Sequence, residues 1–225
     1  MDWSKIYSIF TQLGEGFSFT ICIFFFTLIF SIPLGLLIAK GRMSKNRIVS
    51  SLVTMYISVM RGTPLMLQLL LVYFGPYYLF GVSTGSISLG PFNYRLIASI
   101  IGFSLNYAAY FAEIFRGGIQ SMPRGQYEAS QVLGFSKSQT YFKIILSQVI
   151  KRVLPSVTNE VITLVKDTSL AQVLSVTEMF TVAKNLASAQ VSVIPFIAAG
   201  LFYYLFNAVV DLTMHYIEKK MNYYS

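Results

Sequence analysis

Hydrophobic residues in this chain form long uninterrupted blocks separated by shorter polar segments. Most blocks are about 20 residues long, the length that a helix needs to cross the hydrocarbon core of a bilayer. The pattern predicts an all-α membrane protein with five transmembrane helices in a single domain, residues 1–225. The second helix is unusually long and the fourth is the least apolar. The expected spans are about Phe17 to Ala39, Ile48 to Phe80, Leu96 to Phe115, Val149 to Leu164 and Val193 to Ile217.

The composition agrees with a membrane protein. The 225 residues are 55% hydrophobic and 12% charged, and the mean hydropathy is +0.62. Soluble domains carry about 25% charged residues, so this chain has roughly half of the usual supply for a surface in water. The net charge of +8 does not indicate nucleic-acid binding, because the basic residues lie in short segments beside the apolar blocks, where membrane topology explains them.

The basic residues also predict the orientation of the bundle. Most of them lie in three segments that alternate consistently on one side of the predicted spans: Lys40, Arg42, Lys45 and Arg47; Arg116, Arg124, Lys137, Lys143, Lys151 and Arg152; and Lys219 and Lys220. The loop from Gly81 to Asn93, on the other side, has no charge. Because positive loops stay in the cytoplasm, we expect the N-terminus outside and the C-terminus in the cytoplasm.

One long polar segment, YEASQVLGFSKSQTYFKIILS from Tyr127 to Ser147, falls on this cytoplasmic side. Gly134 is a typical left-handed residue after the end of a helix. Ser136 and Gln139 have the spacing of a capping box that starts a new helix. We therefore expect a helix, a rigid turn and a second helix. The segment is either a handle for a cytoplasmic partner or a solvated loop helix.

The same segment resembles the EAA motif of permease subunits of bacterial ABC importers, E-A-A-x3-G-x9-I-x-L-P. The matching residues are Glu128, Ala129, Gly134, Ile144 and Leu146. Two positions differ, since Ser130 replaces the second alanine and Ser147 replaces the proline. In that family the motif forms the coupling helix, which docks in a cleft of the ATPase subunit. By this resemblance Glu128, Ala129, Ser130 and Gly134 are the ATPase-coupling residues, within a segment of about residues 118–147.

The resemblance extends over most of the chain. RGTPLMLQL from Arg61 to Leu69, NYAAYFAEIFRGG from Asn106 to Gly118 and LVKDTSL from Leu164 to Leu170 are similar to the polar amino-acid subfamily of these permeases. The resemblance implies the type I ABC importer permease fold, a place in the bacterial cytoplasmic membrane, and transport of an amino acid by alternating access. The alternative for Glu128 is an acidic residue that is favourable near the positive end of a helix.

The expected partners follow from what the chain lacks. It contains no G-x-x-x-x-G-K-[ST] phosphate loop, so we expect no enzymatic activity, with ATP and Mg bound by a separate ATPase dimer. The resemblance implies a second permease copy or a paralogue, an extracytoplasmic solute-binding protein, an amino-acid substrate and membrane lipid. With one cysteine and one histidine, the chain predicts no metal site and no cofactor of its own. The rival interpretations are a self-contained secondary transporter or channel, and a membrane-embedded enzyme.

Polar residues inside the predicted spans are candidates for the substrate pathway. Asn106, Tyr110 and Glu113 recur at helical spacing and share one face of the third span. Glu160 lies among apolar residues in the fourth span, where a carboxylate could bind the ammonium group of an amino acid. Arg61 lies 14 residues beyond Arg47, or about 21 Å along a helix.

Each pathway candidate has a structural alternative. For Asn106, Tyr110, Glu113 and Glu160 it is polar pairing between packed helices. For Arg61 it is support of the bend at Gly62, Thr63 and Pro64.

Overall fold

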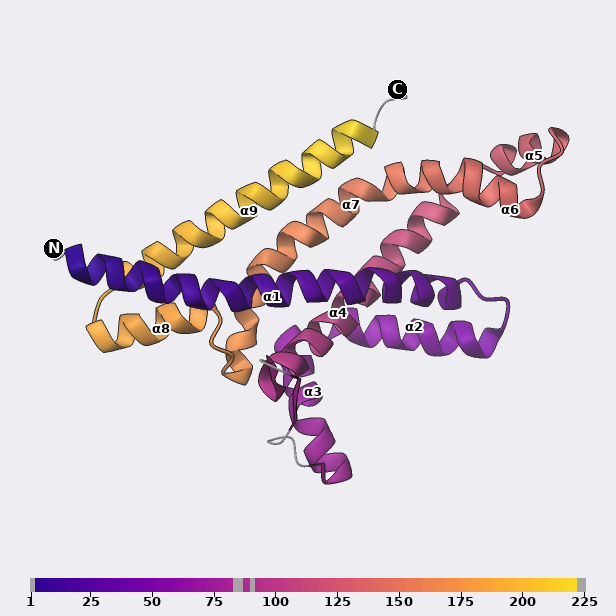
Figure 1. Cartoon of the computed structure of the whole chain (residues 1–225). Helices are drawn as coiled ribbons and strands as arrows, with labels where there is room; N and C mark the ends of the chain where they lie inside the picture. Colours follow the sequence, from indigo (N-terminus) through magenta and orange to yellow (C-terminus); the bar gives the residue numbers. More distant parts are fainter. Residues whose placement is uncertain (1–2, 83–86, 90–91, 222–225) are drawn as a thin grey trace.

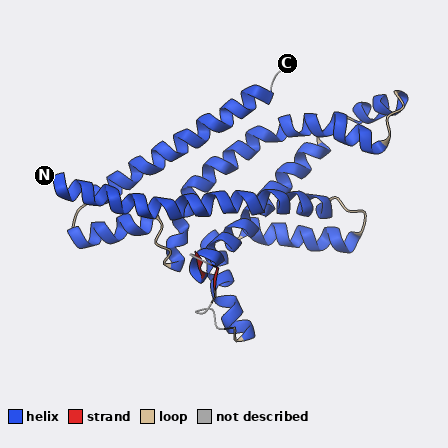
Figure 2. Cartoon of the chain, in the orientation of Figure 1, coloured by secondary structure: helices blue, strands red, loops and turns tan. Residues whose placement is uncertain are grey.

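The computed structural model describes residues 3–82, 87–89 and 92–221, and nearly all of these are helical (Figure 1, Figure 2). The α-helices are α1 (Trp3–Arg42), α2 (Arg47–Gly62), α3 (Leu65–Phe80), α4 (Tyr94–Gln120), α5 (Arg124–Val132), α6 (Lys137–Gln139), α7 (Leu146–Asp167), α8 (Met179–Gln190) and α9 (Ile194–Met221). A π-helical segment, Thr140–Ile145, joins α6 to α7, and the 3-10 helix Thr168–Leu174 follows α7. Strands β1 (Ser88–Leu89) and β2 (Phe92–Asn93) form an antiparallel pair.

Three helices of the described chain, α1, α4 and α9, are long and apolar enough to cross a membrane. The number rises to four if the bent pair α2–α3 is one span. They contain the first, third and fifth expected spans. The fourth expected span lies in α7, which forms but carries Lys151, Arg152, Glu160, Lys166 and Asp167 and is too polar to qualify by the same measure. The expected total of five therefore stays a prediction.

The second expected span is not one helix, which corrects the prediction. It is divided into α2 and α3, which meet at 113°. Thr63 has an extended backbone, with φ −119° and ψ 151°, and Pro64 precedes the first residue of α3. Proline has no N–H for the helical ladder and disfavours helical geometry in the residue before it, so the chain leaves α2 at this point.

Helix α1 is longer than the span expected within it. Its 40 residues extend about 60 Å, twice the hydrocarbon thickness of a bilayer. The sequence did not predict α8, which packs against the N-terminal part of α1 (Figure 1). Ile9 and Leu13 of α1 are buried there in one cluster with Met179 and Ala183 of α8.

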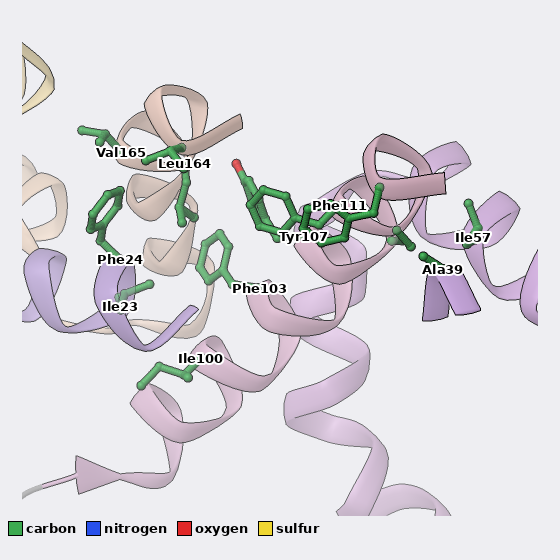
Figure 3. Packing of buried hydrophobic residues seen from close by; sticks show 14 of the residues in the cluster. Ile23, Phe24, Ala39, Ile57, Ile100, Phe103, Tyr107, Phe111, Leu164 and Val165 are labelled. Atoms are coloured by element: carbon green, nitrogen blue, oxygen red, sulfur yellow. The ribbon is translucent and has the colours of Figure 1, made fainter. Parts of the chain in front are cut away.

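The main core is formed where α4 packs against α1, α3 and α7. Phe103, Tyr107 and Phe111 lie along the buried face of α4. Figure 3 shows Phe103 beside Ile23 and Phe24 of α1 and Leu164 of α7, with Phe111 on the side toward Ala39. Gly35 permits the close approach of α1 to α4, because a Cβ atom there would lie 2.8 Å from Cβ of Phe111. Small residues at such contacts are typical of helices packed in a membrane.

Large apolar side chains cover much of the outer surface. Leu37 of α1, Leu71 of α3 and Leu212 of α9 are all more than 60% exposed. Exposed apolar surface on this scale indicates contact with lipid or with other subunits. In the uncharged loop from Gly81 to Asn93, residues 83–86 and 90–91 lie outside the described part of the chain.

Candidate functional site

The segment predicted to be the handle forms α5, the turn after it, α6 and the π-helical segment. It lies at the same end of the molecule as the turn between α1 and α2, on the right in Figure 1. The C-terminal ends of α1, α4 and α9 point toward this side as well. The three basic segments of the sequence are therefore gathered on one side of the bundle.

The turn after α5 has the geometry predicted from Gly134. Its φ of +78° is in the left-handed region that favours glycine. The Phe135 N–H donates to the Ser130 carbonyl at 3.0 Å, and the Gly134 N–H donates to the Gln131 carbonyl at 3.0 Å. This pair of bonds is a Schellman motif, which satisfies the last carbonyls of a helix and fixes the direction of the chain after it.

The second helix of the segment begins as predicted at Ser136. The Gln139 N–H donates to Ser136 Oγ at 3.3 Å, and the Ser136 N–H donates to Gln139 Oε1 at 2.9 Å. This is the reciprocal capping box expected from the spacing. Helical structure then continues through the π-helical segment into α7, so the turn is joined directly to a helix of the bundle.

The segment is also fastened to the bundle by side chains. Arg152 of α7 donates to the Ser121 carbonyl at 2.7 Å, just after the end of α4. Gln148 Nε2 donates to Gln126 Oε1 of α5 at 3.3 Å. Movement of α5 would therefore be transmitted to α4 and α7.

The four predicted coupling residues occupy different environments. Glu128 and Ala129 are exposed on α5, and Gly134 is exposed in the turn. Ser130 is 2% exposed and its hydroxyl donates to the Gln126 carbonyl at 2.6 Å. Glu128 is the fifth residue of α5, beyond the first turn where the helix dipole stabilises an acid, so the alternative explanation for this residue does not fit.

Exposed apolar residues surround the turn, which the sequence analysis did not single out. Val132 is 88% exposed, Leu133 73% and Phe142 64%. The three side chains, here called the apolar tip, belong to a segment that also carries Arg124, Lys137 and Lys143. An apolar centre with a polar rim is typical of a protein–protein interface.

The predicted pathway residues come from three helices. Arg61 lies at the end of α2 and is exposed in the single chain, with its guanidinium carbon 5.1 Å from the centre of the Tyr110 ring on α4. Glu160 is half-buried on α7 and is close enough to Arg61 and Asp167 to interact with both charges. Among the described residues, Glu160 has no hydrogen-bond or ion-pair partner. The structure thus brings one basic and one acidic side chain toward the same region.

Asn106 is 4% exposed and has protein partners. Its Nδ2 atom donates at 2.9 Å to the Met60 carbonyl and at 2.9 Å to Gln68 Oε1. These contacts fit the structural alternative, polar pairing between helices, and a direct contact of Asn106 with substrate stays a prediction.

Two other polar residues of α4, Tyr107 and Glu113, also contact polar side chains of other helices. Tyr107 donates its hydroxyl to Asp167 Oδ2 at 2.8 Å, which joins α4 to the end of α7. Glu113 is 2.6 Å from Arg116 on its own helix and 3.7 Å from Arg42 of α1. Glu113 therefore joins charged groups at the helix ends, as its structural alternative predicts.

Gln68 and Glu178 are buried polar residues that sequence reasoning missed. Gln68 is 7% exposed, and it is the only polar side chain between Leu65 and Val72, a pattern that could have identified it. Glu178 is fully buried and accepts hydrogen bonds at the start of α8, a helix that the sequence did not predict.

Comparisons with known proteins identify the family of this chain. Residues 31–223 match the family described as binding-protein-dependent transport system inner membrane component. The chain is 35% identical to the L-cystine transport system permease protein TcyB of Bacillus subtilis, over 94% of this chain and 87% of that protein. It is 35% identical to the nopaline transport system permease protein NocM of Agrobacterium fabrum, over 99% of this chain and 92% of that protein.

Solved structures agree. One chain of an amino acid ABC transporter crystallised with histidines is 28% identical, with a TM-score of 0.84 over 98% of this chain and 99% of that one. The MetNI methionine ABC transporter in an inward-facing conformation is 16% identical, with a TM-score of 0.70 over 99% of this chain and all of that one. The second likeness shows the shared fold alone.

Proposed function

Because this chain belongs to the family of binding-protein-dependent transport system inner membrane components, we propose that it forms the membrane pathway of an ATP-driven amino-acid importer. It is a multi-pass membrane permease subunit of an ABC transporter. The amino-acid class is supported by relatives whose names refer to cystine, nopaline, glutamine and arginine transport. The likeness to an amino acid ABC transporter over nearly the whole of both chains supports the same class.

The observation that carries the coupling role is the rigid turn at Gly134. A helix–turn–helix that is capped on both sides and joined directly to α7 can transmit a displacement without bending. In the proposed complex, Glu128, Ala129 and the apolar tip contact the ATPase, while Ser130 packs inward. Closure of the ATPase dimer on ATP then moves α5, and with it α4 and α7.

The proposed assembly has two permease chains, identical or paralogous, and two ATPase subunits. The N-terminus of this chain lies outside and its C-terminus in the cytoplasm, where the basic ends of α1 and α9 face the ATPase. ATP and Mg bind the ATPase subunits, and this chain holds no cofactor. A solute-binding protein delivers the amino acid to the outer side.

Arg61, Tyr110 and Glu160 are the proposed lining of the pathway. An amino acid carries a carboxylate and an ammonium group, which the guanidinium of Arg61 and the carboxylate of Glu160 complement. Neither residue is neutralised by an ion pair among the described residues, which supports a role toward a ligand. Ionisable groups at membrane depth are costly and are retained where they serve a pathway.

Reconstitution tests this function. The purified chain is placed in liposomes with its ATPase, its paralogue where one exists, and its binding protein. Uptake of labelled amino acids is measured with and without ATP on the side of the membrane that carries the ATPase. We expect uptake only with ATPase and ATP. Uptake by the chain alone, without any ATPase, would show a self-contained transporter or channel instead.

A further inference from the structure

The break between α2 and α3, which falls within the second expected span, leaves backbone carbonyl groups without helical partners. The end of a helix leaves its last four carbonyls unpaired, and lipid offers no water to satisfy them. Here the Thr63 hydroxyl donates to the Val59 carbonyl at 2.8 Å. The carbonyls of Met60 and Thr63 need other donors.

Two buried amide side chains supply these donors. Gln68 Nε2 lies 3.0 Å from the Met60 carbonyl, 3.1 Å from the Thr63 carbonyl and 2.8 Å from Thr63 Oγ1. Asn106 Nδ2 of α4 donates to the Met60 carbonyl and to Gln68 Oε1, each at 2.9 Å. One side chain from α3 and one from α4 are therefore joined at the last turn of α2. We call this pair the amide latch.

The amide latch acts next to Arg61. Both amides bind the carbonyl of Met60, the residue before Arg61 in the chain. Tyr110 lies four residues after Asn106 on the same face of α4, and its ring lies under the Arg61 guanidinium. Helix α4 thus contacts two consecutive residues of α2 with two side chains one turn apart, which fixes both the backbone and the side chain of the arginine.

We infer that Gln68 and Asn106 are positioning residues, which fix the break between α2 and α3 so that Arg61 is held in place toward the substrate. The inference rests on the proposed function for the part that concerns transport. In this role the amide latch acts on the protein itself, because its amide donors are engaged by the Met60 and Thr63 carbonyls and by Gln68 Oε1. Its effect on transport passes through Arg61.

The structure provides a matched control for a general effect on helix packing. Tyr56 also joins α2 to α4, through a 2.6 Å hydrogen bond from its hydroxyl to the Leu105 carbonyl. Tyr56 lies one turn before Met60, and its hydroxyl binds neither of the two amide side chains. Tyr56→Phe therefore removes one hydrogen bond between the same helices and leaves the amide latch intact.

The experiment uses the reconstituted complex and compares three single variants, Gln68→Leu, Asn106→Leu and Tyr56→Phe. It adds the swapped double variant, which combines Gln68→Asn with Asn106→Gln. Loss of a buried hydrogen-bonded partner should raise the KM for uptake about tenfold in both leucine variants. The KM of Tyr56→Phe should stay within about twofold of the wild-type value. The swapped double variant keeps two facing amides, so its KM should be close to that of wild type. Arg61→Leu should raise KM in the wild type but add little in the Asn106→Leu background, because the latch acts through Arg61.

Hydrogen exchange supplies a readout that does not need transport. Backbone amides of residues 61–63, 65 and 66 should exchange hydrogen faster in the two leucine variants than in wild type or Tyr56→Phe. If the wild-type complex transports no amino acid, the proposed function fails, and the exchange rates alone decide on the latch. The positioning role is overturned if wild type transports but the leucine variants have the same KM and hydrogen-exchange rates as Tyr56→Phe. It is also overturned if Arg61→Leu raises KM as much in the Asn106→Leu background as in wild type.

Discussion

The guanidinium of Arg61 rests on the ring of Tyr110, 5.1 Å from its centre, at the point where α2 ends. A cation over an aromatic face is worth about 0.5–2 kcal/mol, so its loss should displace the arginine measurably. We expect Tyr110→Leu to raise the KM for amino-acid uptake about three- to tenfold. Tyr110→Phe keeps the ring and should remain close to wild type in the same liposome assay.

Tyr77→Leu is the matched control for this pair. Tyr77 is 56% exposed on α3, and its ring partner is the neighbouring Tyr78. Its replacement should not change KM. Equal KM values for Tyr110→Leu and Tyr110→Phe would show that the ring does not hold Arg61.

Gly134→Val should uncouple ATP hydrolysis from transport. A side chain at φ +78° is strained by about 1–2 kcal/mol, and the cost is greater for a β-branched residue, so the turn after α5 should reorient. The variant should insert into the membrane in normal amount, while the amino acid transported per ATP hydrolysed falls several-fold. Uptake and phosphate release are measured on the same liposomes.

Gly125 offers a control on the same helix. It lies in α5, without positive φ and with no atom within 4 Å of an added Cβ. Gly125→Ala should leave coupling unchanged and stabilise α5 by up to about 1 kcal/mol. A coupling ratio in Gly134→Val equal to that of Gly125→Ala would contradict the docking role of the turn.

Local signals allowed much of this fold to be predicted. The apolar blocks identified α1, α4 and α9, because length and composition alone decide whether a helix can span a bilayer. Gly134 and the Ser136–Gln139 pair identified the turn, because a left-handed residue and a capping box depend on neighbours in sequence. Both features are local, and both are found in the structure.

Long-range features were not predictable in the same way. The two halves of the second span differ in direction by 113°, and the amide latch that stabilises this bend joins residues 38 positions apart. Helix α8 was missed because its start depends in part on a distant residue. Glu178 caps the helix by binding the Thr181 N–H, and it also binds the Tyr203 hydroxyl of α9, which is far away in sequence. Asn106 was identified as a polar residue facing inward, but only the packing of α4 against α2 shows what it contacts.

The apolar tip should be needed for assembly with the ATPase. Val132 is 88% exposed, and a charge in its place would lie unpaired in an apolar contact. We expect Val132→Asp to weaken the association of permease and ATPase by at least tenfold, measured by co-purification at graded ATPase concentrations. The transport defect should be relieved by excess ATPase.

Val191 is the control for this substitution. It is 94% exposed and lies just after α8, at the opposite end of the molecule (Figure 1). Val191→Asp introduces the same charge on a similarly exposed valine, and ATPase binding should be unaffected. If both variants bind the ATPase equally well, the apolar tip is not the contact surface.

The proposed orientation predicts which cysteines react from each side. In a variant with Cys22 replaced by serine, Lys45→Cys lies in the turn between α1 and α2, and Ser188→Cys lies on α8. Both positions are exposed. A membrane-impermeant thiol reagent added to intact cells should label Ser188→Cys but not Lys45→Cys, and inside-out vesicles should reverse the result. The opposite pattern would place the N-terminus in the cytoplasm.

Glu178 should stabilise the end of the molecule that carries α8. Its carboxylate accepts from the N–H groups of Phe180 at 2.7 Å and Thr181 at 2.8 Å, and from the Tyr203 hydroxyl of α9 at 3.1 Å. Removal of a cap that also joins two helices costs about 1–3 kcal/mol. At about 2–4 °C per kcal/mol for a chain of 225 residues, Glu178→Ala should lower the unfolding temperature in detergent by about 2–12 °C.

The comparison that isolates this effect is Glu15→Ala, which removes an exposed acid from α1 at the same end. It should shift the unfolding temperature by less than about 2 °C, because an exposed surface substitution is usually within 0.5 kcal/mol of neutral. ATPase binding should be normal in both variants, since the apolar tip lies at the other end. Equal unfolding temperatures for the two variants would show that the Glu178 hydrogen bonds do not hold α8 against α9.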